Sequence, residues 1–409
     1  MTALARPSDL ENADHLDATP TGSRWFGSGR STAADARAAG IEATAAALHG
    51  RTAALVIVFC PASTDLPAML DGVRSECGDV PLIGGTGIAQ YASDGLVGPA
   101  VVVSALGGAG FQIVTSVASD VSAGQRAAGE LVAASVAELT REHSLLLLIC
   151  DGLAGEQHEL VRGAYSVVGA AVPLAGGCAA DDLAYELTSQ FFADADGVHV
   201  LTDSVVAAAI GSDAPIGVGV AHGWRKVGEP MLVTASTGGV VRTLDGLPAL
   251  DVFAERTGAT QATLDDAHAF RLFALNHPLG MSRRSGEDIR VIHEGNRADG
   301  SITCLADVAQ GTLLWHMESD EAGLIATVDA AYDEAVDSLA GRPPLGFLAF
   351  DCGVRFLFLG VDGTHQEIDR MMRRVGDVPL AGFYTFGEIA RTHGARGMHH
   401  LTLVLVAFS

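Results

Sequence analysis

Polar and thiol side chains stand at the ends of short apolar runs in this sequence. Thr86 and Cys178 each follow a pair of glycines, and Thr385 lies in the equivalent loop of a third copy of the same pattern. Asp181 lies just beyond Cys178, and Cys352 closes a further apolar run. In open α/β sheets, ligands bind beyond the carboxyl ends of strands, where loops and backbone amides converge. We therefore expect these side chains to share a ligand site, with glycine loops whose N–H groups can approach an anion. The alternative is that the glycines only shape tight turns.

Two charged side chains extend this candidate site. Arg355 can clamp a carboxylate in bidentate fashion, and Glu388 can receive an ammonium group, a combination that suits an amino acid. Tyr384, beside Thr385, completes the group. The alternative is that Arg355 and Glu388 pair with each other, or with Asp residues, as structural ions.

His222 and Trp224 flank a glycine at the expected end of a strand. They are candidate ligand or haem contacts, because imidazole is a common axial ligand of haem iron. The sequence has no C-x-x-C-H attachment site, so any haem would be non-covalent. His277, before Pro278, is a second candidate. The alternative is that these histidines are structural.

Thiol chemistry is a further possibility that the sequence leaves open. A nucleophilic thiol needs a base and an orienting group. Asp351 is beside Cys352, for which no His can be predicted, and Asp181 and Asp182 are close to Cys178. The six cysteines show no zinc spacing. We therefore predict reduced, mostly buried thiols, no catalytic residue and no metal site.

An internal repeat positions these side chains. Gly-Asp-Val-Pro-Leu occurs at residues 78–82 and again at 376–380, and a looser copy begins at Ala171. Apolar runs over 54–60, 145–150 and 346–352 precede the three copies and read as buried strands. Such repeats expose architecture that periodicity alone misses. We predict an α/β protein of repeated strand-helix-strand units with mixed, partly antiparallel sheets.

The connecting segments give further expectations. The runs over 100–106 and 111–117 are separated by a glycine-rich tetrapeptide and predict a β-hairpin. The β-like runs between residues 191 and 220 predict an antiparallel meander. Residues 1–21 are polar and without periodicity, which predicts a disordered tail.

Composition excludes several function classes. A formal net charge of -24 argues against nucleic acid as a partner, since such binding depends on Lys and Arg. No apolar run is long and uninterrupted enough to span a bilayer, and no secretory signal is visible. The expected location is the cytoplasm.

Three stretches resemble a known family. Residues 217–230, 244–250 and 380–389 are similar to signatures of the FIST (F-box and intracellular signal transduction) proteins. The resemblance implies a FIST N-terminal domain over 22–248 and a FIST C-terminal domain over 249–409, packed together. It also implies a sensory, small-ligand-binding role in signal transduction. Amino acids have been proposed as ligands for the family, and some members are haem proteins that sense nitric oxide.

The combined expectation is a cytoplasmic, non-enzymatic sensor of a small ligand, possibly an amino acid. No kinase or cyclase sequence is visible, so we expect a separate signalling output protein. A non-covalent haem-based nitric oxide sensor is the first alternative, and a Cys-dependent hydrolase is the second.

Overall fold

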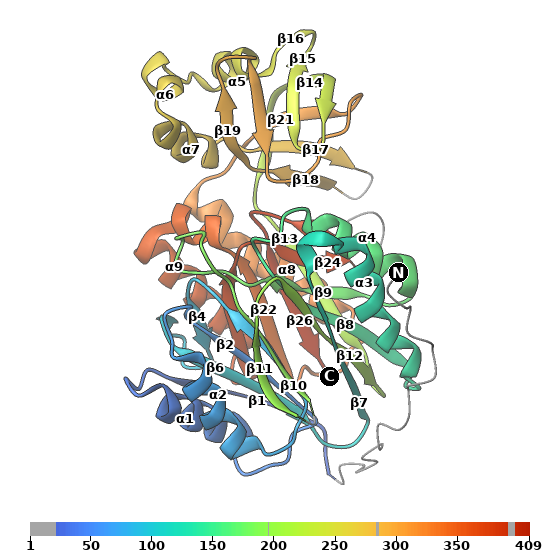
Figure 1. The fold of residues 1–409 in the computed structure, drawn as a ribbon. Helices are drawn as coiled ribbons and strands as arrows, with labels where there is room; N and C mark the ends of the chain where they lie inside the picture. Colours follow the sequence, from blue (N-terminus) through green and yellow to red (C-terminus); the bar gives the residue numbers. More distant parts are fainter. Residues whose placement is uncertain (1–21, 195, 284–285, 392–396) are drawn as a thin grey trace, which may run out of the picture.

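A computed structural model describes residues 22–194, 196–283, 286–391 and 397–409. The protein is mixed α/β with several mixed sheets, as predicted (Figure 1). The predicted disordered tail over 1–21 lies outside the described residues. The elements group into three similar units and one inserted domain.

Each unit contains one strand-helix-strand repeat in which the two strands are parallel neighbours. In all three repeats, the last residues of the two strands are register partners: Cys60 with Thr86, Cys150 with Cys178, and Cys352 with Thr385. The repeats are β2 (Leu55–Cys60), α2 (Leu66–Cys77) and β3 (Leu82–Thr86); β8 (His143–Cys150), α4 (Gln157–Val168) and β9 (Leu174–Cys178); and β22 (Gly346–Cys352), α9 (Gly353–Val375) and β23 (Leu380–Thr385).

The three repeat helices end in the same way. Gly78, Gly169 and Gly376 follow them with φ of 65°, 68° and 62°, a region that favours glycine over other residues. Asp65 caps the amino end of α2 by accepting a hydrogen bond from the Ala68 N–H. The matching ends show that the repeat extends to backbone conformation.

Three six-stranded sheets have the same strand order. Each places two strands before the parallel pair and a short hairpin after it. The sheets run β1 (Trp25–Ser31), β6 (Val101–Gly107), β2, β3, β10 (Gln190–Asp194), β11 (Gly197–Leu201); β7 (Phe111–Ser119), β12 (Ser204–Ser212), β8, β9, β24 (Glu388–Arg391), β25 (Met398–His399); and β13 (Ile216–Ala221), β26 (Leu403–Phe408), β22, β23, β4 (Gln90–Ala92), β5 (Val97–Gly98).

The units exchange strands in a cycle. The strand that follows β3 is β4, and it pairs with β23 of the third unit. Likewise, β10 leaves the second unit to pair with β3, and β24 leaves the third unit to pair with β9. The exchange contradicts two expectations from the sequence. β6 and β7 lie in different sheets and form no hairpin, and the expected meander is distributed over three sheets.

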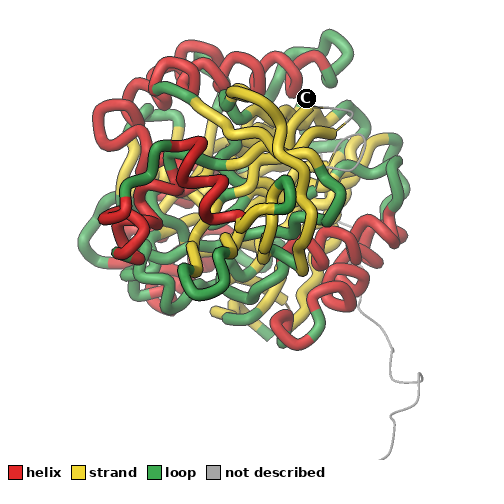
Figure 2. Tube along the Cα trace, turned by 90° about the horizontal axis from the view of Figure 1, so that it is seen from above, coloured by secondary structure: helices red, strands yellow, loops and turns green. Residues whose placement is uncertain are grey.

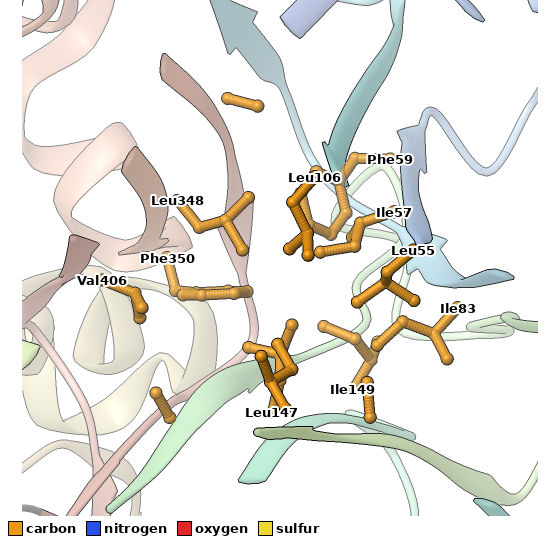
Figure 3. Packing of buried hydrophobic residues seen from close by; sticks show 14 of the residues in the cluster. Leu55, Ile57, Phe59, Ile83, Leu106, Leu147, Ile149, Leu348, Phe350 and Val406 are labelled. Atoms are coloured by element: carbon orange, nitrogen blue, oxygen red, sulfur yellow. The ribbon is translucent and has the colours of Figure 1, made fainter. Parts of the chain in front are cut away.

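Hydrophobic side chains fill the space that the three sheets enclose. Leu55, Ile57 and Phe59 from β2 face Leu147 and Ile149 from β8 and the side chains of β22 (Figure 3). The Phe59 ring stacks on Phe383 with centroids 4.2 Å apart. The centre of the molecule is therefore a packed core.

A pair of helices covers the outer face of each sheet, so that strands gather in the middle and helices lie around them (Figure 2). α1 (Ala36–Leu48) pairs with α2, α3 (Gln125–Ala133) with α4, and α8 (Glu321–Asp337) with α9. A methyl group on Gly163 of α4 would meet the Arg126 carbonyl of α3, and one on Gly129 would meet the Leu160 carbonyl. Glycines thus allow these two backbones to touch.

The third unit contains an inserted domain between β13 and α8, at the top of Figure 1. It has its own hydrophobic core around Phe253 and Phe270. Its elements are β14 (Arg225–Thr237), β15 (Val240–Leu244), β16 (Leu247–Pro248), α5 (Ala249–Thr257), α6 (Gln261–Asp265), α7 (Ala267–Leu275), β17 (Leu279–Arg283), β18 (Gly286–Arg290), β19 (Ile292–Asn296), β20 (Ser301–Cys304) and β21 (Leu313–Glu318). Residue 248, after which the sequence placed a domain boundary, is the last residue of β16, one of the elements of this domain.

The close α3–α4 contact gives a stability prediction. Gly163→Ala should lower the free energy of unfolding by about 1–3 kcal/mol, because the added methyl forces the helices apart. Gly22→Ala is the control, since Gly22 is exposed, lies outside any helix and its added methyl meets no atom within 4 Å, and it should change stability by less than about 0.5 kcal/mol. Urea unfolding of both variants measures this. Equal effects would contradict the packing explanation.

Candidate functional site

The turns after β3, β9 and β23 meet at one end of the packed core. The Ala180 N–H donates to the Thr86 carbonyl (2.8 Å), the Ile88 N–H to the Tyr384 carbonyl (3.0 Å), and the Phe386 N–H to the Cys178 carbonyl (3.2 Å). These three hydrogen bonds link the turns in a closed ring. The structure therefore brings together Thr86, Cys178 and Thr385.

The ring leaves no hollow at its centre. A methyl group on Gly87 would strike the Phe383 ring, and one on Gly177 would lie 2.8 Å from Thr385. Thr86 is fully buried, and its hydroxyl accepts a hydrogen bond from the Ser189 N–H (3.1 Å). The expectation that the glycine loops present free amides to an anion is therefore wrong for this ring, because neighbouring turns already use those amides.

Arg355 is a buried structural ion. Its guanidinium is completely inaccessible and donates to Asp351 Oδ1 (2.8 Å), to Thr327 Oγ1 (3.0 Å) and to Glu367. Tyr384 is equally buried and donates its hydroxyl proton to Glu367 Oε2 (2.9 Å). Clamping of a ligand carboxylate by Arg355 does not fit this geometry.

Asp351 and Glu367 share the charge of Arg355 unequally. Burial and the neighbouring Glu367 raise the pKa of Asp351 well above its ordinary range, which favours the protonated carboxyl group. The carboxylate of Glu367 then balances the guanidinium of Arg355, and all three side chains are buried from solvent. This is the pairing with Asp that the sequence left open as the alternative.

Glu388 does not pair with Arg355 but lies in a nest of hydroxyl donors. Thr385 donates to Oε1 (2.9 Å), and the hydroxyl and N–H of Thr402 donate to Oε2 (2.7 and 3.2 Å). Burial raises the pKa of Glu388 to about 7, although these donors oppose the shift. The carboxyl group is fully buried, so it offers no exposed site for a ligand ammonium group.

Cys352 lies near Glu388 and lines a cavity. Burial, and then the nearby Glu388, raise the pKa of this thiol well above its ordinary value. Asp351 accepts a hydrogen bond from the Cys352 backbone N–H (2.8 Å), so it is not oriented as a base for the thiol. The thiolate is the nucleophilic form of cysteine, so this geometry does not favour the Cys-dependent hydrolase alternative.

Cys178 is fully buried, with its sulfur 3.2 Å from that of Cys150. The hydrogen bond to Cys150, followed by burial, raises the pKa of Cys178 well above its ordinary value. These two thiols, like the other described cysteines, are free, as predicted.

Asp181 organises a loop. Its carboxylate accepts hydrogen bonds from the backbone N–H groups of Tyr185 (3.1 Å), Glu186 (2.7 Å) and Leu187 (3.3 Å). Within this loop, Leu183 and Tyr185 have φ of 67° and 58°, which costs free energy for residues other than glycine. Asp181 thus holds Tyr185 in place.

His222 and Trp224 do not fit an axial haem site. His222 Nδ1 accepts a hydrogen bond from the Trp224 N–H (3.0 Å), so Nε2 carries the proton of the neutral ring and has no lone pair for iron. Trp224 is buried and packs edge-on against Phe358. His277 is stacked on Phe273, with centroids 4.1 Å apart, inside the inserted domain.

A cavity of about 390 Å³ lies where the second and third units meet the inserted domain. Of the ten predicted site residues, Cys352 and Thr385 line it. Sequence reasoning missed Tyr185, Phe386 and His400. Its wall consists of residues 152, 153, 155–158, 183, 185, 239, 293, 303–307, 352–354, 385, 386 and 400. Two other cavities, of about 420 and 660 Å³, lie at the amino ends of α1 and α2 and of α3 and α4.

The fold and this cavity define the class of protein. It is an α/β protein of three strand-exchanging units, with a ligand-sized cavity beside an inserted domain. Family models match the FIST N domain over residues 54–247 and the FIST C domain over 249–391. The chain belongs to the FIST family, as its signatures predict.

Curated relatives share part of the chain. The uncharacterized protein Rv0628c of Mycobacterium tuberculosis is 28% identical over 224 residues, 54% of this chain and 57% of that protein. The uncharacterized protein Mb0898c of Mycobacterium bovis is 27% identical over 226 residues, 54% of this chain and 56% of that protein. The chain thus spans a little over half the length of these relatives. A solved cyanuric acid hydrolase is 10% identical with a TM-score of 0.31 over 95% of this chain and 100% of that one, a likeness too low to carry an argument.

Glu388 gives a prediction about pH. Its pKa is higher in the folded protein than in the unfolded chain, so the folded state binds more protons and stability is lost as pH rises through about 7. Glu388→Gln removes this loss. Its stability relative to the wild type should rise between about pH 5 and pH 8 by on the order of 3 kcal/mol. Urea unfolding across this range measures it, with exposed Glu186→Gln as the control that should show no such trend.

Arg355 gives a second prediction. Arg355→Met leaves buried carboxyl groups without their cation and should cost about 3–5 kcal/mol of stability. Adding Glu367→Gln should recover part of that loss. Arg374→Met, on the more exposed face of α9, should cost less than about 1 kcal/mol. A stable Arg355→Met single variant would contradict the structural role.

Proposed function

We propose that this FIST protein is a small-ligand-binding sensory protein in signal transduction, and that its ligand occupies the cavity of about 390 Å³. The observation that supports the proposal is the place of this cavity. It lies at the strand ends where α/β proteins commonly bind ligands, and loops from two units and the inserted domain contribute to it.

The inserted domain supplies the means of sensing in this proposal. Gly239, His293 and residues 303–307 form one side of the cavity, and the other side belongs to the packed three-unit body. A ligand that contacts both sides favours the arrangement in which they are closest, because it stabilises that arrangement by its differential affinity. The signal would then reach a separate output protein through the inserted domain.

Further parts of the proposal are that the ligand is a small metabolite and that the protein acts in the cytoplasm without catalysis. No helix among the described residues is long and apolar enough to cross a membrane. The strong negative charge argues against a nucleic-acid partner.

Blocking the cavity tests the proposal. A ligand that binds only the folded state raises the melting temperature, so a thermal-shift screen of metabolites should yield at least one stabilising compound. Leu305→Trp places a large side chain in the cavity wall and should abolish that shift. Leu313→Trp is the matched control, since Leu313 is similarly exposed (44% against 46%) in the same domain but does not line the cavity. A shift that survives Leu305→Trp would place the ligand elsewhere.

A further inference from the structure

The cavity has an aromatic wall. The rings of Tyr185 and Phe386 are nearly parallel, with an interplanar angle of 5° and centroids 4.8 Å apart, and both line the cavity. Tyr185 is 56% exposed, which is unusually high for a large aromatic side chain. Phe386 stacks on one face of its ring, and no ring of another described residue stacks on the other face. Flat aromatic ligands gain stability against such rings by offset stacking.

The loop that carries Tyr185 adopts a backbone conformation that costs free energy. Leu183 and Tyr185 both adopt positive φ, and the Asp181 carboxylate fixes the loop through three backbone N–H groups. Strained residues that the surrounding structure fixes are concentrated at ligand sites. The three hydrogen bonds to Asp181 thus hold a strained loop whose Tyr185 side chain lines the cavity.

His400 provides a polar contact in the same cavity. Its side chain is only 6% exposed, and no described residue forms a hydrogen bond with the ring. Burial, together with Arg290 and His399, lowers the pKa of His400 to about 3, so the ring is neutral. A buried polar group without a partner costs free energy, and a ligand group that bonds to it recovers that cost. A neutral imidazole offers one donor and one acceptor.

The charges around the cavity restrict the ligand. No Lys or Arg is among the described residues that line the cavity. The carboxylates of Glu156 and Asp307 line it, and both are exposed or half-exposed to solvent. Arg355 and Glu388 are buried behind the wall with their own partners. A buried ligand anion would therefore have no Lys or Arg in the wall to balance it, which is costly. A ligand cation would meet only carboxylates that face solvent, one of which, Asp307, already lies 3.2 Å from His158 Nε2.

We propose that the cavity binds an uncharged aromatic heterocycle, stacked on the Tyr185–Phe386 pair and hydrogen-bonded through a ring N–H to His400. The inference rests on the proposed function and specifies the chemical class of its ligand. It differs from the amino-acid expectation, because the groups assigned to the ammonium and carboxylate of an amino acid are not accessible.

Three probes with one ring system test the charge. Indole is neutral, indole-3-acetate is an anion and tryptamine is a cation. Isothermal titration calorimetry with the full chain should show binding of indole at millimolar concentration or below, and binding at least about tenfold weaker for the two charged probes. Tighter binding of either charged probe, or no binding of indole, would overturn the proposal.

The contacts are tested by two matched comparisons. Tyr185→Ala should weaken indole binding about tenfold, whereas Tyr185→Phe, which keeps the ring, should not. 1-Methylindole lacks the N–H group, so it should bind the wild type about tenfold more weakly than indole does. In the His400→Phe variant, 1-methylindole and indole should bind with equal affinity. His400→Phe removes no protein hydrogen bond, so it should fold. An undiminished difference between indole and 1-methylindole in that variant would overturn the contact with His400.

The two hypotheses fail differently. Suppose that a metabolite raises the melting temperature, that Leu305→Trp abolishes this rise, and that indole does not bind. This outcome would support the sensor proposal and contradict the heterocycle inference. Loss of indole binding in Leu305→Trp together with retention in Leu313→Trp is the result expected if both hold.

Discussion

The cyclic exchange of β4, β10 and β24 is the constraint on which the rest of this structure depends. Each sheet is completed by a strand that another unit supplies. The chain must therefore cross from unit to unit directly after each repeat, which forces the three turns into one ring. That ring fixes the strand ends and hence the side chains available for a site.

The same constraint explains why the candidate site, the cavity of about 390 Å³, lies to one side. The ring itself is filled by its own side chains and hydrogen bonds, so three equivalent turns do not make a central binding site. The inserted domain breaks the repetition in the third unit. It faces Cys352, Phe386 and His400 and encloses a cavity that the repeats alone would not form. Buried carboxyl groups behind this wall serve packing and pairing.

The sequence predicted local structure better than assembly. The strands of each repeat follow from apolar runs, a signal that acts within a few residues. The sequence predicted a hairpin of β6 and β7, but β6 pairs with β1 and β2, and β7 pairs with β12. The pairing of β7 thus depends on a strand far away in the chain, which a local turn signal does not reveal. The site shows the same limit. Cys352 and Thr385, which line the cavity, were predicted because they end repeated strands. Tyr185 and His400 carry no signal in spacing and reach the cavity only through the fold.

Strand exchange also has a consequence for the order in which the molecule is made. β4 is synthesised early, yet its partner β23 comprises residues 380–385, near the end of the chain. Until the ribosome has released that segment, the first unit holds a strand without a sheet and an apolar face without a cover. Contacts between such distant segments form slowly, and exposed strands aggregate in the meantime. Nascent chains of this protein therefore depend on shielding during translation for longer than a protein whose domains close one after another.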